Sequence, residues 1–358
     1  MVGREQLGSA GQSLWMSHVS RRSLREGSLT EHIEYGSVTG GALCLKAIGQ
    51  ALGSSEVYDV SIYNNLKEGI FGEPLAIDLI LDDVRYAADL LRHVFEITDG
   101  VDGWAVLPIL PQTANSTEVF AQEISALYAR MRRPNILISI PSVPEMMEAI
   151  EEIIFTGTPI NISLIYSSDQ YLEVAGAYMR GIERRISAGL KPAVSAFISI
   201  PISRLANEFF KSMTITEATQ SALDSAKDMF RTMRALHISQ SWERINSKGT
   251  RPLRVIWQAS GDDFSEGLTY ELFYNLIAPF TIMMMSEPAM GGEFTQMELR
   301  QPMTRDLVDR EEFSVDSDNG RNLAKVMQEG DHADQTKNWI ELLEALARKS
   351  ASIIGNIQ

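Results

Sequence analysis

The chain has 358 residues, of which 44% are hydrophobic and 22% are charged, a balance that fits a folded globular protein and argues against a disordered one. Its formal net charge of −15 argues against nucleic acid and against an anionic membrane surface as partners, because both attract positive patches. Cys44 is the only cysteine, which excludes an intramolecular disulfide and favours a cytoplasmic protein.

The first residues lack the apolar core of a signal peptide, and no apolar run is long enough to span a membrane. The five histidines are scattered along the chain, and none is paired with another at the spacing of metal ligands. We therefore expect no histidine-based metal site and no membrane segment.

Short apolar segments alternate with longer segments of helical periodicity, which is typical of a parallel α/β sheet. We expect strands over residues 12–19, 37–39, 103–110, 136–140, 160–166, 194–200, 253–259 and 280–285. We expect helices over residues 21–33, 57–70, 76–97, 117–131, 144–155 and 168–188, long helices within residues 208–245, and a final helix over 339–354.

Eight strands with interleaved helices predict a (β/α)8 TIM barrel, an α/β fold. We expect one domain over residues 1–358, in which residues 286–358 form a C-terminal helical tail packed on the barrel. Barrel enzymes place their chemistry at the C-terminal ends of the strands, here called the mouth.

The segment from Arg133 to Glu145 combines a turn signal, an apolar strand and a helix start. Ser142 is predicted to be the N-cap of the following helix, with Pro144 in its first turn and Glu145 closing a capping box. Ser167 is predicted to cap the next helix in the same way.

Several segments resemble the transaldolase family. Residues 133–145 are similar to its central strand, R-P-N-x-x-I-K-I-P-A-T-P-E, and residues 11–15 to its G-Q-S-(apolar)-W opening. Further likeness lies in residues 157–167, 199–204 and 248–260. The resemblance implies a TIM barrel and, in the family, a lysine that forms a Schiff base with a sugar ketone.

The residues that carry the family's chemistry are replaced in this chain. Where the family has its lysine this chain has Ser139, and a hydroxyl cannot form an imine. The family's first-strand aspartate is Ser17, its third-strand glutamate falls at Pro108, and a threonine after the lysine is Val143. The residues of the motifs that remain, or are replaced by a similar side chain, are Thr39, Asn161, Ser163, Ser199 and Arg204.

The replacements favour a more apolar mouth with an acidic edge. Met284, within the Met283–Met285 run of the eighth strand, suits an apolar pocket, although such methionines are as often ordinary core. Asp262, Asp263 and Glu266 form a D-D-x-x-E pattern after the seventh strand. This pattern resembles the metal motif of class I terpene synthases and suits Mg²⁺ bridging to a diphosphate. The Asp82–Asp83 pair is interpreted instead as a solvated helix face.

Three functions remain open. The first is an enzyme that acts without a Schiff base on a small phosphorylated, partly apolar metabolite. The second is a Mg²⁺-dependent prenyl-diphosphate lyase or terpene cyclase, and the third is a non-catalytic binding protein. No nucleotide cofactor is expected, Mg²⁺ is the one candidate cofactor, and a homodimer is left open.

The candidate catalytic residues are Asp262, Asp263, Glu266 and Ser139, the first three also as metal ligands. The candidate substrate-binding residues are Arg204, Asn161, Ser163, Ser199, Thr39, Ser17, Trp257 and Met284.

Overall fold

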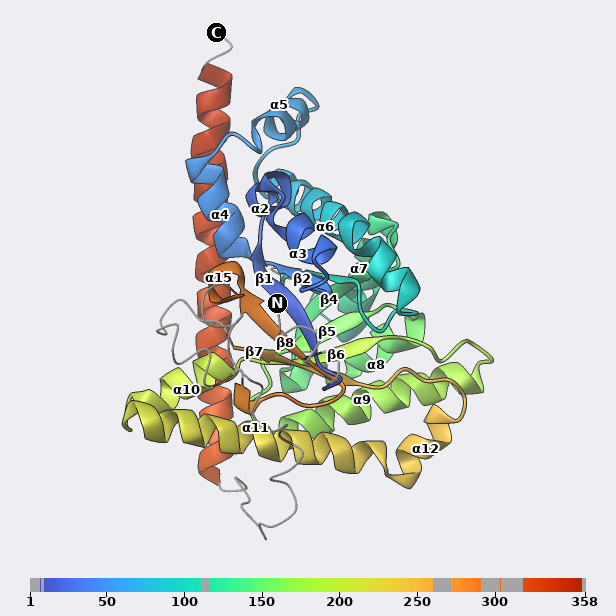
Figure 1. Ribbon diagram of the computed structural model, residues 1–358. Coiled ribbons are helices and arrows are strands. Elements are labelled where there is room, and N and C mark those ends of the chain that lie inside the picture. Colours follow the sequence, from blue (N-terminus) through green and yellow to red (C-terminus); the bar gives the residue numbers. More distant parts are fainter. Residues whose placement is uncertain are drawn as a thin grey trace. The chain divides into compact units, whose positions relative to one another are not determined.

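The computed structural model describes residues 7, 10–110, 116–259, 272, 274–290, 303 and 318–355. Its eight strands form a closed barrel in the order of the sequence, and the paired strands run parallel (Figure 1). The strands are β1 (Ser13–Val19), β2 (Gly40–Leu43), β3 (Trp104–Leu107), β4 (Ile136–Pro141), β5 (Ile160–Ser163), β6 (Ala196–Ile200), β7 (Arg254–Gln258) and β8 (Thr281–Ser286). The predicted (β/α)8 barrel is therefore confirmed.

Helices follow the strands along the chain. They are α2 (Arg21–Glu26), α3 (Ser28–Glu34), α4 (Leu45–Ser54), α5 (Asp59–Lys67), α6 (Gly72–Ile97), α7 (Thr117–Met131), η1 (Pro144–Met146), α8 (Met147–Thr156), α9 (Ser168–Ser187), α10 (Ile202–Phe210), α11 (Ile215–His237), α12 (Gln240–Asn246), α14 (Glu287–Met290) and α15 (Asp318–Gly355). None of those in the described ranges combines the length and the apolar content that crossing a bilayer requires.

The chain divides into two compact units, which are described separately. Unit 1 comprises Met1–Leu14, Thr113–Leu127 and Ser139–Gly330, and unit 2 comprises Trp15–Gln112, Tyr128–Ile138 and Asp331–Gln358. The expectation of a single domain with a tail from residue 286 stays a prediction.

Besides shifts of a few residues at element ends, unit 2 departs from the expected elements in three places. The predicted helix over residues 21–33 is two helices, because Gly27 adopts a left-handed φ of 86° between them. The second strand begins at Gly40 and not at Ser37. The helix α4 was not predicted, since residues 45–54 carry no strong start or stop signal of their own.

A buried polar cluster joins α2, α5 and α6 in unit 2. The Asp83 carboxylate, only 1% exposed, accepts hydrogen bonds from Arg21 Nε at 2.5 Å and from the Tyr58 hydroxyl at 2.6 Å. Arg21 also donates to Ser61 Oγ at 2.6 Å. The solvated face predicted for Asp82 and Asp83 is therefore wrong for Asp83, which lies on the same stripe of α6 as the buried Ile80 and Ala87.

Local capping signals set the helices of unit 1. Ser167 Oγ accepts the Gln170 backbone N–H at 3.2 Å, which confirms the predicted cap of α9. Thr214 and Glu217 form a capping box at the start of α11. These caps end the loops after β5 and α10 and fix where each helix begins.

The final helix, α15, is much longer than the predicted 339–354. Its residues up to Gly330 belong to unit 1 and the rest belong to unit 2. Within unit 2, Lys349 Nζ donates to the Ser55 carbonyl at 3.0 Å and pairs with Asp59 at 2.9 Å. The expected C-terminal helix is thus present, and it begins about twenty residues earlier.

Candidate functional site

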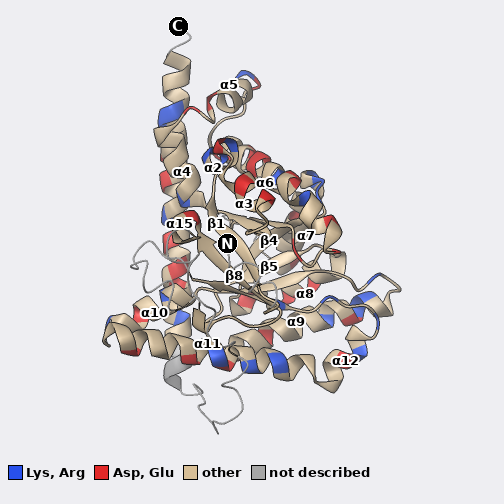
Figure 2. Ribbon diagram, in the orientation of Figure 1, with Lys and Arg blue, Asp and Glu red and all other residues tan. Residues whose placement is uncertain are grey.

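The strands of this barrel are almost free of ionisable side chains. None of the eight contains lysine, aspartate or glutamate, and the only ionisable residues on them are His18 and Arg254. In Figure 2 the labelled strands β1, β4, β5 and β8 are tan, whereas red and blue lie on the helices and on connecting loops. The charged groups that barrel enzymes usually carry on their strand ends are missing from these strands.

Three polar side chains of unit 1 form a buried chain across β4, β5 and β6. Asn161 Nδ2 donates to Ser139 Oγ at 3.2 Å, and Ser199 Oγ donates to Asn161 Oδ1 at 2.7 Å. Ser199 is fully buried, while Asn161 is 2% and Ser139 8% exposed. The structure thus brings together three of the predicted site residues, Ser139, Asn161 and Ser199.

The direction of these hydrogen bonds decides whether the Ser139 hydroxyl can donate a hydrogen bond to a ligand. Both polar ends of the Asn161 amide are engaged by serine hydroxyls. Because Ser139 accepts from Asn161, its own hydrogen remains available to donate. Within the described ranges Asn161 is the one hydrogen-bond partner of the Ser139 hydroxyl. Ser139 is therefore poised to donate to a carbonyl or hydroxyl oxygen.

The end of β4 differs from the sequence prediction. Ser142 is not the helix N-cap, since that place is taken by Val143, which makes no side-chain cap. The Ser142 hydroxyl donates instead to the Leu164 carbonyl at 2.9 Å, and its backbone N–H donates to the Ser163 carbonyl at 3.0 Å. The predicted capping box is wrong because a tertiary acceptor, the Leu164 carbonyl just after β5, competes with the helix N–H groups.

Ser163 and Arg204 lie further along the same unit. Ser163 Oγ, on a side chain 6% exposed, donates to the Ile140 carbonyl at 3.4 Å. Arg204 stands in the first turn of α10, and its guanidinium lies 3.6 Å from the place a Cβ on Gly330 would occupy. Arg204 is thus partly covered by α15 within unit 1.

The register of β7 and β8 separates Trp257 from Met284. Ser199 pairs with Ile256, Ile200 with Trp257, and Gln258 with Met284. Because side chains alternate along a strand and laterally paired residues share a face, Met284 faces the same side as Ser199. Trp257 faces the opposite side and is fully buried, where it packs as core together with Met283.

Ser17 and Thr39 belong to unit 2 and lie at different levels. Ser17, on β1, hydrogen-bonds His18 Nδ1 at 2.9 Å. Thr39 precedes β2, so it lies at the N-terminal end of that strand, away from the mouth. Cys44 follows the C-terminal end of β2, and its backbone N–H donates to the Val19 carbonyl at 3.2 Å.

The predicted metal ligands Asp262, Asp263 and Glu266 lie outside the described residues. In the part of the chain that the structure describes, no group of three histidine, cysteine, aspartate or glutamate side chains is arranged to hold a metal ion. The Mg²⁺ site therefore stays a prediction.

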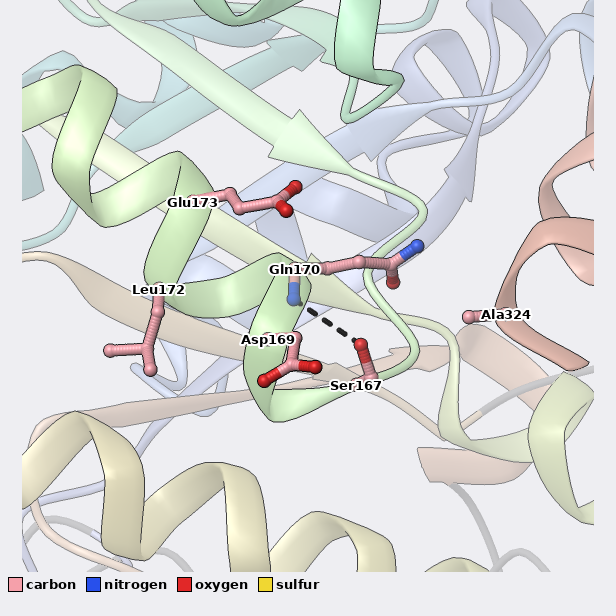
Figure 3. Close-up of a pocket in the computed structure, with 6 residues that line it drawn as sticks. All are labelled: Ser167, Asp169, Gln170, Leu172, Glu173 and Ala324. Carbon is pink, nitrogen blue, oxygen red and sulfur yellow. Dashed lines mark hydrogen bonds between the residues drawn. The ribbon is translucent and has the colours of Figure 1, made fainter. Parts of the chain in front are cut away.

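A pocket of about 300 Å³ opens in unit 1 beside the start of α9 (Figure 3). Its lining residues are Ser167, Asp169, Gln170, Leu172, Glu173 and Ala324. In Figure 3 the Gln170 side chain extends towards Ala324 of α15. Among the described residues that line it, two are carboxylates and none is basic, which makes this lining poorly suited to a phosphate.

Comparison with known proteins identifies the family. The family model described as transaldolase/fructose-6-phosphate aldolase matches residues 14–263. The chain is 28% identical to a transaldolase of Thermobifida fusca over 361 residues, which covers 97% of this chain and 98% of that protein. It is 30% identical to a transaldolase of Acidothermus cellulolyticus over 303 residues, which covers 82% of this chain and 81% of that protein.

A transaldolase of Mycobacterium tuberculosis is 30% identical over 293 residues, and the match covers 78% of either chain. These matches extend through the strands that carry Ser139, Asn161 and Ser199. The chain therefore belongs to the transaldolase/fructose-6-phosphate aldolase family.

Proposed function

We propose that this protein is a transaldolase-family enzyme that acts on a small phosphorylated metabolite without forming a Schiff base. The observation that carries the proposal is the absence of lysine, aspartate and glutamate from all eight strands. A Schiff-base reaction needs an amine nucleophile and groups that move protons. Because the barrel strands carry neither an amine nor a carboxylate, they do not supply the groups that a Schiff-base reaction of a sugar needs.

The Ser139–Asn161–Ser199 chain supports a non-covalent role in the same place. Asn161 fixes the Ser139 hydroxyl as an acceptor, which leaves the Ser139 hydrogen to donate to a ligand. A buried hydroxyl donor in a low-dielectric site polarises the carbonyl that it binds. Ser139 therefore holds a carbonyl or hydroxyl oxygen of the ligand, and Met284 lies on the same face to contact its carbon atoms.

The phosphate would bind to Arg204, as the family resemblance implies. A guanidinium can donate two parallel hydrogen bonds to phosphate oxygens. Arg204 is partly exposed in the first turn of α10, where the helix N-terminus also favours an anion. In the same proposal the protein works in the cytoplasm, where the single thiol Cys44 stays reduced.

The two other functions make different demands. The prenyl-diphosphate lyase or cyclase needs Asp262, Asp263 and Glu266 to hold Mg²⁺, and it stays an alternative hypothesis. The non-catalytic binding protein needs ligand binding without turnover, or no ligand binding at all. Neither has a contact in the described residues that favours it over the first function.

A thermal-shift and calorimetry panel tests the proposal. Fructose 6-phosphate should raise the melting temperature without metal, because a ligand that binds only the native state stabilises it. Ser139→Ala should weaken this binding about 10-fold, the loss of roughly one hydrogen bond. The exposed Ser187→Ala is the matched control and should leave it unchanged.

Other ligands decide between the alternatives. A shift that requires geranyl diphosphate and Mg²⁺ together would replace our proposal by the lyase or cyclase function. No shift with any phosphorylated ligand would favour the non-catalytic protein.

A further inference from the structure

A glutamine of α15 reaches the ends of two barrel strands within unit 1. Gln328 is 7% exposed, and its Nε2 donates to the Ser142 carbonyl at 3.1 Å, to Ser142 Oγ at 3.0 Å and to the Leu164 carbonyl at 2.9 Å. Two amide hydrogens thus serve three acceptors. The neighbouring buried residues of α15, Ala324 and Met327, lie on the same helical stripe, so Gln328 is a polar group set in an apolar contact.

The acceptors lie directly beyond the candidate site. Ser142 is three residues after Ser139 on the β4 segment, and Leu164 is three residues after Asn161 on the β5 segment. The two segments are linked to each other through Ser142, which bonds the carbonyls of Ser163 and Leu164. Gln328 strengthens this link, because its side-chain amide donates hydrogen bonds to both segments.

The backbone at this link is held in an unfavourable conformation. Leu164 has φ of 67°, in the left-handed region that a leucine rarely adopts. Such a conformation persists only where surrounding contacts determine it. The Leu164 carbonyl accepts from both Ser142 and Gln328, and these are the contacts that hold the turn after β5.

We infer that Gln328 is a positioning residue for the Ser139–Asn161–Ser199 chain. By holding the ends of β4 and β5 at one separation, it sets the 3.2 Å contact between Asn161 Nδ2 and Ser139 Oγ. The final helix thereby takes part in the site through its first turns and not only in the stability of the fold. What this positioning serves rests on the proposed function, but the positioning itself can be measured without any ligand.

The test uses the full-length protein labelled with ¹⁵N-asparagine. The side-chain amide resonances of Asn161 are identified by their loss in Asn161→Asp. In Gln328→Met, which keeps the length of the side chain and removes its donors, these resonances should move or broaden. Glu329→Gln, an exposed neighbour on the same helix, should leave them in place. Gln328→Asn, which keeps an amide on a shorter side chain, is the second variant should Gln328→Met not fold.

The measurements distinguish a Gln328 that positions the Asn161 side chain from a Gln328 that only docks α15. A lower melting temperature with unchanged Asn161 resonances would overturn the inference, because Gln328 would then only dock α15. If fructose 6-phosphate binds the wild type, Gln328→Met should weaken it about 10-fold and Glu329→Gln less than twofold. Absence of binding to the wild type would count against the proposed function, while the Asn161 resonances would still decide the positioning role.

Discussion

Replacing Asp83 by alanine tests whether the buried cluster of unit 2 holds α2, α5 and α6 together. The Asp83 carboxylate is buried and is the acceptor for Arg21 and for Tyr58. Without it, the Arg21 guanidinium, whose side chain is 7% exposed, stays buried with no carboxylate opposite its Nε. Breaking a buried ion pair from one side costs about 3–5 kcal/mol of the free energy of unfolding.

The assay is urea denaturation and thermal melting at pH 8. Burial raises the pKa of Asp83 to about 6, while Arg21 and Tyr58 act against this rise, so the carboxylate is ionised at pH 8. At about 2 °C per kcal/mol for a chain of this size, the melting temperature should fall by about 6–10 °C. Tyr58→Phe removes one hydrogen bond to a charged group and should cost about 1.5–3 kcal/mol.

The neighbouring aspartate provides the control. The Asp82 side chain is 51% exposed and pairs with Arg85 at 2.8 Å, so Asp82→Ala should change stability by no more than about 1 kcal/mol. Combining Asp83→Ala with Tyr58→Phe should cost less than the sum of the two, since both remove the same hydrogen bond. Equal effects of Asp83→Ala and Asp82→Ala would refute the reasoning.

Three further predictions concern packing, pH and chemistry. A Cβ at Gly40 would lie 2.5 Å from the Trp15 indole, so Gly40→Ala should lower the free energy of unfolding by about 1–3 kcal/mol. A Cβ at Gly53 in α4 would meet nothing within 4 Å, so Gly53→Ala should raise it by about 0.5–1 kcal/mol. Thermal melting of the two variants measures both effects. Burial lowers the pKa of His237 to about 4, below the value of about 6.5 in the unfolded chain. The contribution of the neutral His237 ring to the free energy of unfolding is therefore fully present above pH 6.5 and is lost as the pH falls through 4. Urea titrations at pH 7 and 4.5 should show a smaller loss in His237→Gln than in the wild type, and an equal loss would contradict the assignment. Ser139→Lys, if folded by circular dichroism, should gain a borohydride-trapped adduct with fructose 6-phosphate because an amine can attack the carbonyl. A folded variant that binds the sugar phosphate but gives no adduct would contradict this prediction.

Hydrophobic periodicity was sufficient to predict the barrel, because each strand and helix carries its own pattern and eight such units close in only a few ways. The errors arose where backbone conformation decided the boundary. Gly27 separates two helices where the pattern predicted one, and the second strand begins at Gly40, so that Thr39 lies before the strand and not at its C-terminal end. The motif resemblance identified Thr39 in the sequence, but it did not predict at which end of the strand Thr39 lies.

Long-range partners explain the remaining differences. Asp83 lies in an apolar stripe, which is a visible signal, but its partners Arg21 and Tyr58 are 62 and 25 residues away. Ser142 matched a capping pattern, but its hydroxyl donates instead to the carbonyl of Leu164, just after β5. The role of Gln328 was not predicted, because the sequence of a helix does not indicate which strand ends its side chains will contact. The hydrogen bond between Asn161 and Ser139 depends on how the neighbouring strands align.

The central claim, that this barrel forms no Schiff base, is tested most directly by borohydride trapping followed by mass spectrometry of the intact protein. The protein and the Thermobifida fusca transaldolase are each incubated with fructose 6-phosphate, reduced and weighed. Our account predicts a covalent sugar adduct on the relative and none on this protein. An adduct on this protein, mapped to any lysine, would contradict the account and would show that an amine outside the eight strands has taken over the family's chemistry.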